Sequence, residues 1–161
     1  MHPTNEQEAL EALKGDDLEL AATAEAILWR TWCSSGDSEA DRIFRAGVDA
    51  MQQAKLAEAE ELFSRVIQIR PDFAEGWNKR ATVRYLAENY DGAIADCEAT
   101  LARKPHHFGA LSGQGLCHVA LGQHREAAAL FRRTLAVHPH LDAARRNLRL
   151  TLGEAVKGNG H

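Results

Sequence analysis

The spacing of three prolines constrains the fold of this 161-residue chain more than any other sequence feature. Pro71, Pro105 and Pro139 lie 34 residues apart, and several small and large apolar positions repeat at the same interval. These positions are Gly47, Ala81 and Gly115; Ala59, Ala93 and Ala127; Ile43, Trp77 and Leu111; and Phe63, Cys97 and Phe131. A period of this length indicates supersecondary units that bury their apolar faces by stacking on one another.

The pattern predicts one pair of antiparallel helices in each unit. Only Gly or Ala fits where two helix axes approach closely, so the small residues mark the helix crossings. Proline then ends the second helix, because it lacks an amide donor and disfavours helical geometry in the residue before it. Asp72 with Glu75, and separately Asp142, are predicted to cap the helices that follow two of the prolines.

The segment AEGWNKRATVRYLAENYDGAIADCEATLARKP resembles a tetratricopeptide repeat (TPR). It matches the Trp, small, Tyr, Ala and Pro landmarks of that family at Trp77, Ala81, Tyr85, Tyr90, Ala93 and Pro105. The resemblance covers three units, residues 40–73, 74–107 and 108–141, and implies an all-α, right-handed α-solenoid of stacked helical hairpins. The strings FAEGWNKRAT and HFGALSGQGL are similar to a bacterial group of small TPR proteins without established activity.

The chain departs from the family pattern at four core positions. Arg80 and Gln114 replace the usual Leu, and Thr100 and Thr134 replace a usual Ala. These departures affect the expected local packing and leave the expected fold unchanged.

Residues 1–39 lack the landmarks but keep helical apolar spacing, which predicts an N-terminal degenerate helical hairpin. Thr4 with Gln7 resembles a capping box for its first helix, Gly15 and Asp16 separate its two helices, and residues 36–38 link it to the first repeat. Whether this hairpin fills the binding groove or extends the array is left open by the sequence. Trp29 and Trp32 lie on its second helix, where core packing is favoured over a role as partner anchors.

Residues 142–161 are predicted to form a C-terminal capping helix and a frayed tail at 158–161. Leu148, Leu152 and Val156 are spaced four apart and form an apolar stripe expected to pack on the last repeat. The arginines of this segment are interpreted as the polar outer face that a terminal helix requires, and not as nucleic-acid contacts.

The resemblance implies that a partner peptide lies on the concave face, which is lined by the first helix of each repeat. By register, the predicted partner-binding residues are Phe44, Arg45, Val48, Asn78, Lys79, Thr82, Ser112, Gly113 and Leu116. A glycine inside a helix costs about 0.5 to 1 kcal/mol relative to Ala, so Gly113 needs a reason. Close approach of a peptide or of the N-terminal hairpin would supply one, and close packing on a neighbouring helix is the equally weighted alternative.

TPR co-chaperones bind the acidic tails of heat-shock chaperones through a carboxylate clamp of Lys, Asn and Arg side chains. In this register the five clamp positions hold Phe44, Val48, Lys79, Gly109 and Gly113. The sequence therefore predicts no chaperone-tail clamp and an unidentified peptide partner with an apolar portion instead.

Charge is distributed unevenly along the chain, whose net charge is −4. Residues 1–39 hold 2 basic and 9 acidic side chains, whereas residues 103–161 hold 9 basic and 3 acidic ones. This division permits head-to-tail self-association, although two solvated faces of opposite sign are the simpler interpretation. Helical-repeat RNA binding is the other alternative, and the acidic net charge disfavours it.

No catalytic role, cofactor or metal is expected. Cys97 shares its position with Phe63 and Phe131, which indicates a buried hydrophobe and not a nucleophile. His106, His107, His138 and His140 flank two of the prolines and are expected to be solvated turn residues; one repeat separates His106 from His140, too far for a zinc site without other ligands. The absence of a signal-like or membrane-spanning segment and the odd number of cysteines favour the cytoplasm, or the periplasm if a signal peptide was removed.

Overall fold

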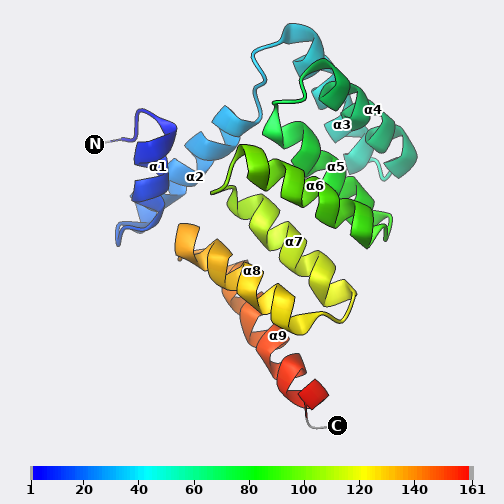
Figure 1. The fold of residues 1–161 in the computed structure, drawn as a ribbon. Helices are drawn as coiled ribbons and strands as arrows, with labels where there is room; N and C mark the ends of the chain where they lie inside the picture. Colours follow the sequence, from blue (N-terminus) through cyan, green and yellow to red (C-terminus); the bar gives the residue numbers. More distant parts are fainter. Residues whose placement is uncertain (1, 160–161) are drawn as a thin grey trace.

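The computed structural model describes residues 2–159, and this part of the chain forms nine α-helices packed as consecutive hairpins (Figure 1). The helices are α1 (Glu6–Leu13), α2 (Leu18–Trp32), α3 (Ser38–Gln52), α4 (Leu56–Ile69), α5 (Ala74–Leu86), α6 (Tyr90–Arg103), α7 (Phe108–Ala120), α8 (His124–Val137) and α9 (Asp142–Asn159). The predicted all-α solenoid is confirmed. The predicted frayed tail is wrong for residues 158–159, which end α9, and its residues 160–161 lie outside the described part.

The helix pairs α3–α4, α5–α6 and α7–α8 correspond to the three predicted repeats. A Cβ atom added at Gly47 would lie 2.7 Å from the Phe63 ring, and one at Gly115 would lie 2.7 Å from the Phe131 ring. Both phenylalanines are fully buried. The recurring glycines therefore do mark the helix crossings, where a side chain would collide with a ring that has no room to move.

The turns inside the repeats share one backbone feature at the same 34-residue interval. Ala54, Glu88 and Gly122 adopt positive φ angles of 60°, 62° and 74°. Glycine adopts this conformation without strain, whereas Ala and Glu do so at a cost. The stacking of the helices thus sets the same turn geometry in all three repeats. Only the third turn has a glycine, Gly122, at the position with the positive φ angle.

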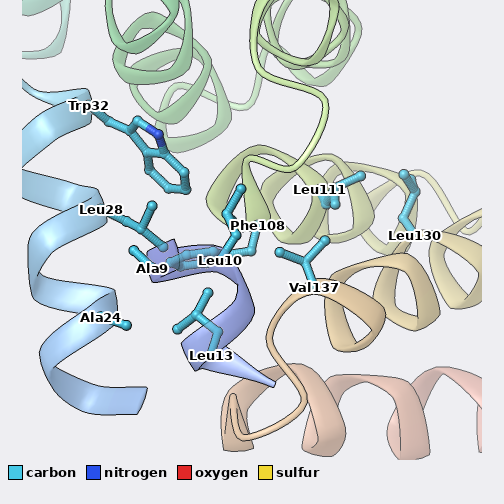
Figure 2. Close-up of a cluster of buried hydrophobic side chains, with 10 residues drawn as sticks. All are labelled: Ala9, Leu10, Leu13, Ala24, Leu28, Trp32, Phe108, Leu111, Leu130 and Val137. Carbon is cyan, nitrogen blue, oxygen red and sulfur yellow. The ribbon is translucent and has the colours of Figure 1, made fainter. Parts of the chain in front are cut away.

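The N-terminal hairpin folds back along the array and does not extend it beyond α3 (Figure 1). Its apolar side chains form a cluster with the start of α7 and the end of α8 (Figure 2). The cluster comprises Ala9, Leu10, Leu13, Ala24, Leu28 and Trp32 of the hairpin with Phe108, Leu111, Leu130 and Val137 of the third repeat. Trp32 is 4% exposed, which confirms a core position for this tryptophan.

Three predicted helix caps are wrong. Helix α1 is capped by Asn5, whose Oδ1 accepts from the Glu8 N–H at 2.9 Å, while Thr4 precedes the cap and bonds the Glu8 carboxylate. The N-cap residue of α5 is Phe73, and no side chain bonds the free amides at this helix end. Asp72 pairs with Arg70 instead, and Glu75 points into the core. Asp142 is the first residue of α9, one position after the cap.

The cap helix α9 also differs from its prediction. Among the described side chains of α9, Ala144 and Thr151 are buried, whereas Leu148 is half-buried and Leu152 and Val156 are exposed. The predicted stripe therefore lies at the edge of the contact with α8. Arg149 stands 34 residues after Gly115, at the position where each repeat needs a small residue. A further hairpin of the same kind therefore has no close crossing point on α9.

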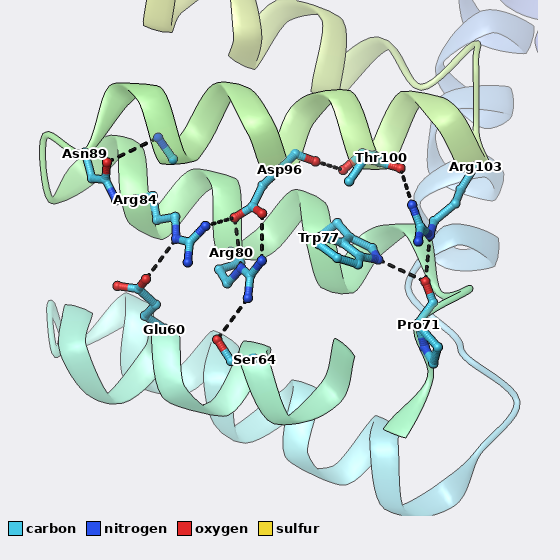
Figure 3. Close-up of polar contacts among 12 residues, drawn as sticks. Glu60, Ser64, Pro71, Trp77, Arg80, Arg84, Asn89, Asp96, Thr100 and Arg103 are labelled. Carbon is cyan, nitrogen blue, oxygen red and sulfur yellow. Dashed lines mark hydrogen bonds and ion pairs between the residues drawn. The ribbon is translucent and has the colours of Figure 1, made fainter. Parts of the chain in front are cut away.

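An ionic network replaces apolar packing in the second repeat (Figure 3). Asp96 of α6, 3% exposed, accepts hydrogen bonds from Arg80 at 2.8 and 2.9 Å and from Arg84 at 3.0 Å. Arg80 also bonds Ser64, and Arg84 bonds Glu60, both on α4. The arginine that stands in place of the family leucine thus connects three helices through one buried carboxylate.

None of the described helices has the length and apolarity needed to cross a membrane.

Two neighbouring glycines of α7 test the packing account. We expect Gly115→Ala to lower the free energy of unfolding by about 1 to 3 kcal/mol, because its methyl group would overlap the Phe131 ring. Gly113→Ala should instead raise it by about 0.5 to 1 kcal/mol, because a Cβ there lies 3.8 Å from the Cys97 sulfur, an ordinary contact. Urea denaturation of both variants measures the difference; equal effects would contradict the assignment of Gly115 as a crossing point.

Asp96→Asn tests the ionic network. The substitution leaves the partly buried Arg80 without a carboxylate and Arg84 with Glu60 alone, and we expect it to reduce the free energy of unfolding by about 3 kcal/mol. Asp72→Asn is the matched control, because it removes the carboxylate of a solvent-exposed pair and should leave stability near that of the wild type. Similar denaturation midpoints for the two variants would show that the network adds nothing to stability.

Candidate functional site

The first helices of the three repeats, α3, α5 and α7, form a face that contains two hollows. The first, here called the central hollow, has a volume of about 340 Å³ and lies between α5, α6, α7 and the N-terminal hairpin. It is lined by Trp29, Asn78, Lys79, Ala81, Thr82, Tyr85, Leu86, Cys97, Gly109, Gly113, Leu116 and Cys117. Most of these side chains are apolar, which suits an apolar ligand group.

The second hollow, here called the linker hollow, lies beside the segment that joins the N-terminal hairpin to α3. It has a volume of about 490 Å³ and is lined by Cys33, Ser34, Asp41, Phe44, Arg45, Val48, Asp49 and Lys79. Lys79 lines both hollows, so the two form adjoining parts of one surface.

The structure brings eight of the nine predicted partner-binding residues to these two hollows. Phe44, Arg45 and Val48 line the linker hollow; Asn78, Lys79, Thr82, Gly113 and Leu116 line the central hollow. The ninth, Ser112, is half-buried and lines neither of them.

Two of the eight residues are largely enclosed. Phe44 packs edge-on against Phe63 and Phe73 in the core of the first repeat, so only its margin faces the linker hollow. The Asn78 side chain donates to buried Glu75 at 2.9 Å. Phe44 and Asn78 therefore form part of the walls of the hollows and have few atoms available to contact a ligand.

One wall of the central hollow comes from Trp29, which lies outside the repeats on α2. Its indole is half-buried and meets the rings of Trp32, His107 and Phe108 edge-on, with centroids 5.4 to 5.5 Å apart. A Cβ atom at Gly109 would lie 2.7 Å from the Trp29 ring. The absence of a side chain at Gly109 therefore allows the Trp29 ring of the hairpin to pack against α7.

Gly113 does not lie at a close approach of the hairpin. The expected close approach of the hairpin occurs at Gly109, one helical turn earlier, and not at Gly113. Packing does not require glycine at position 113 either, because an added Cβ would make an ordinary contact with Cys97. Close approach of a ligand remains as the prediction for this residue.

A buried polar junction holds the hairpin against α5 and α7. Glu75 and His107 are both fully buried, with 2.7 Å between Glu75 Oε2 and His107 Nε2. His107 Nδ1 accepts from the Ala110 N–H and caps α7, so Nε2 carries the hydrogen and donates it to Glu75. The imidazole stacks on Trp32 with a centroid distance of 4.3 Å.

The expectation that the turn histidines are solvated is wrong for two of the four. His107 is buried in the junction, and His138 is buried with Nε2 2.9 Å from Glu25 of α2. His140 is half-buried and bonds the Gly15 carbonyl, and His106 alone of the four is exposed. The 34-residue period predicts that these histidines lie in successive turns between repeats. It does not predict that the N-terminal hairpin covers those turns.

The three thiols lie on or beside the site. Burial raises the pKa of Cys97 far above its usual value and raises the pKa of Cys117 and of Cys33 to about 11. The Cys97 and Cys117 thiols therefore remain protonated at neutral pH and contribute to the apolar lining of the central hollow. The predicted buried position of Cys97 is confirmed.

Comparison with known proteins identifies the repeats. A sequence profile of the tetratricopeptide repeat matches residues 44–108 and 80–140. The chain belongs to the tetratricopeptide-repeat family. TPR domains are protein–protein interaction modules, and the predicted family and repeat architecture are confirmed.

A TPR repeat-containing protein of Rhizobium etli is 29% identical over 128 residues, which are 80% of this chain and 62% of that protein. The chain thus spans less than two thirds of this relative. Among solved structures, the Sgt2 TPR domain from Aspergillus fumigatus is similar with a TM-score of 0.74 and 20% identity, covering 78% of this chain and 84% of that one. The first TPR domain of Spaghetti (RPAP3) bound to the HSP90 peptide SRMEEVD has a TM-score of 0.72 and 23% identity, covering 74% and 96%.

The polar junction is tested by His107→Asn. Asparagine can still cap α7, but the variant loses the bond to Glu75 and the stack on Trp32. We expect a loss of about 2 kcal/mol in the free energy of unfolding and faster hydrogen exchange in α1 and α2. His106→Asn, at the exposed neighbouring position, is the control. Unchanged exchange of the hairpin amides in the His107 variant would show that the junction does not hold the hairpin.

Proposed function

We propose that this protein is an adaptor that binds a peptide segment of a partner protein across the central and linker hollows. The main observation behind this proposal is that the two hollows adjoin at Lys79 and are lined by residues of α3, α5 and α7. Residues of three successive repeats on one surface suit an extended chain, which binds by side-chain pockets spaced along its length.

Heat-shock chaperone tails are not the proposed ligand, although one similar TPR structure contains an HSP90 peptide. Of the five clamp positions, Phe44 is buried in the core and Gly109 is covered by Trp29. Val48 and Gly113 carry no charge, which leaves Lys79 as the cation. A single ammonium group does not reproduce a clamp of several charge-assisted donors, so a peptide with an apolar portion fits this surface better.

The proposed role involves no catalysis. The thiols at the central hollow are held in their protonated form by burial, which suits a binding surface and not a nucleophile. The remaining lining side chains offer apolar contact, hydroxyl and amide groups, and one ammonium.

Self-association is a second candidate, favoured by the exposed apolar residues of α9. Leu150 and Val156 are 64% and 72% exposed, and the basic C-terminal part of the chain would complement the acidic N-terminal hairpin of another copy. Light scattering at low ionic strength tests this role: a mass above that of one chain supports it, and a monomer counts against it.

Gly113→Gln tests the proposed binding surface. The added side chain would enter the central hollow without disturbing the core, because only the Cys97 sulfur lies near an added Cβ. We expect a partner captured from lysate of the source organism by the wild type to be lost, while the thermal unfolding midpoint stays close to that of the wild type.

Gly153→Gln is the matched control, because it places the same side chain on α9, where an added Cβ meets nothing within 4 Å. It should leave capture intact. Retention of every captured protein by the Gly113 variant would contradict the assignment of the central hollow.

A further inference from the structure

The N-terminal hairpin adds a side chain to the binding face that the repeats alone do not provide. Trp29 is fixed by edge-on contacts with three aromatic rings and reaches over Gly109 to close one end of the central hollow. Its other side lies 5.7 Å from Lys79 Nζ, measured to the ring centroid. A tryptophan held rigidly at the edge of an apolar hollow loses little entropy on binding and offers a large contact area.

Lys79 is the one charged side chain among the described residues that line the central hollow. Its ammonium lies 3.6 Å from Glu75 Oε1, a long contact. Glu75 has no exposed surface and is also held by His107 and Asn78, so it cannot itself meet a ligand. An ammonium has three donors, and Lys79 therefore keeps donors for a carboxylate that arrives from solvent.

We propose that Trp29 and Lys79 together select the ligand: a peptide segment in which a large apolar side chain enters the central hollow beside Trp29 while an adjacent carboxylate binds Lys79. The inference rests on the proposed function and specifies its partner chemistry. The hollow of about 340 Å³ accepts a side chain of the size of Leu, Met or Phe. The hairpin thereby forms part of the binding site and not merely a cover for the array.

The central hollow requires an apolar group of the ligand, and the charge of Lys79 requires an acidic group next to it. Leu116, Cys97 and Cys117 offer no hydrogen bond of consequence, so a polar group placed among them would lose its water without compensation. Lys79 stands where the central and linker hollows meet, so the carboxylate must flank the apolar anchor and not follow it at a distance.

A phage-displayed library of random 12-residue peptides, selected on the intact chain, tests the inference. We expect the enriched peptides to share a large apolar residue within two positions of Asp or Glu. A synthetic peptide of the enriched sequence should bind Lys79→Gln and Trp29→Ala about 10-fold or more weakly than the wild type. Selection on Lys79→Glu should replace the acidic residue by Lys or Arg. Enrichment of peptides without an acidic neighbour to the apolar residue would overturn the inference.

Controls separate this inference from the proposed function. Lys55→Gln removes an exposed lysine from outside the two hollows and should bind like the wild type. Trp29→Leu is a second variant for the case that Trp29→Ala does not fold, because leucine keeps an apolar contact with the hairpin core. Thermal unfolding shows whether each variant is folded before its affinity is compared with that of the wild type. If the peptide loses affinity for Gly113→Gln but not for the Trp29 and Lys79 variants, the groove binds peptides and the inference is wrong. If none of these variants changes the affinity, both are wrong.

Discussion

The buried carboxylate of Glu75 is the group on which the placement of the N-terminal hairpin depends. An ion without solvent contact costs several kcal/mol unless its hydrogen bonds are satisfied, and here the partners come from His107, Asn78 and Lys79. His107 serves in one tautomer only, because its other nitrogen caps α7. Its ring in turn stacks on Trp32, which belongs to the hairpin core. One carboxylate thus links the hairpin, the start of α7 and the lysine that lines both hollows.

This link explains why the hairpin lies along the array and not at its end. The turns before α7 and α9 present residues that the hairpin can satisfy: Lys104 pairs with Glu6 at 2.8 Å, and His138 pairs with Glu25. The Lys104–Glu6 ion pair and the His138–Glu25 hydrogen bond join the acidic hairpin to these turns. The ion pair neutralises part of the uneven charge distribution within one molecule. The apolar cluster in Figure 2 supplies the burial that polar contacts alone do not provide.

The repeats followed from the sequence because their constraint is local and periodic. Gly47 and Gly115 occupy the same position in the first and third repeats, and each is required by contact with a buried phenylalanine ring. Eight of the nine partner-binding residues predicted from the family resemblance lie on one surface. The hairpin contacts did not follow, because Trp29 and Gly109 are 80 residues apart and no period relates them. The predicted cap before α5 failed for a related reason: Glu75 has the spacing of a capping residue, but tertiary contact with His107 places it in the core.

The central claim is that the hairpin is docked on α7 and completes the proposed binding face. Nuclear Overhauser effects between the Trp29 ring and the Gly109 α-protons test this claim in the free protein, without any ligand. The ring lies so close to Gly109 that a Cβ there would collide with it, so the account predicts strong cross-peaks between these protons. Their absence, with the Gly109 α-protons seeing only residues of the repeats, would place the hairpin elsewhere and contradict the account.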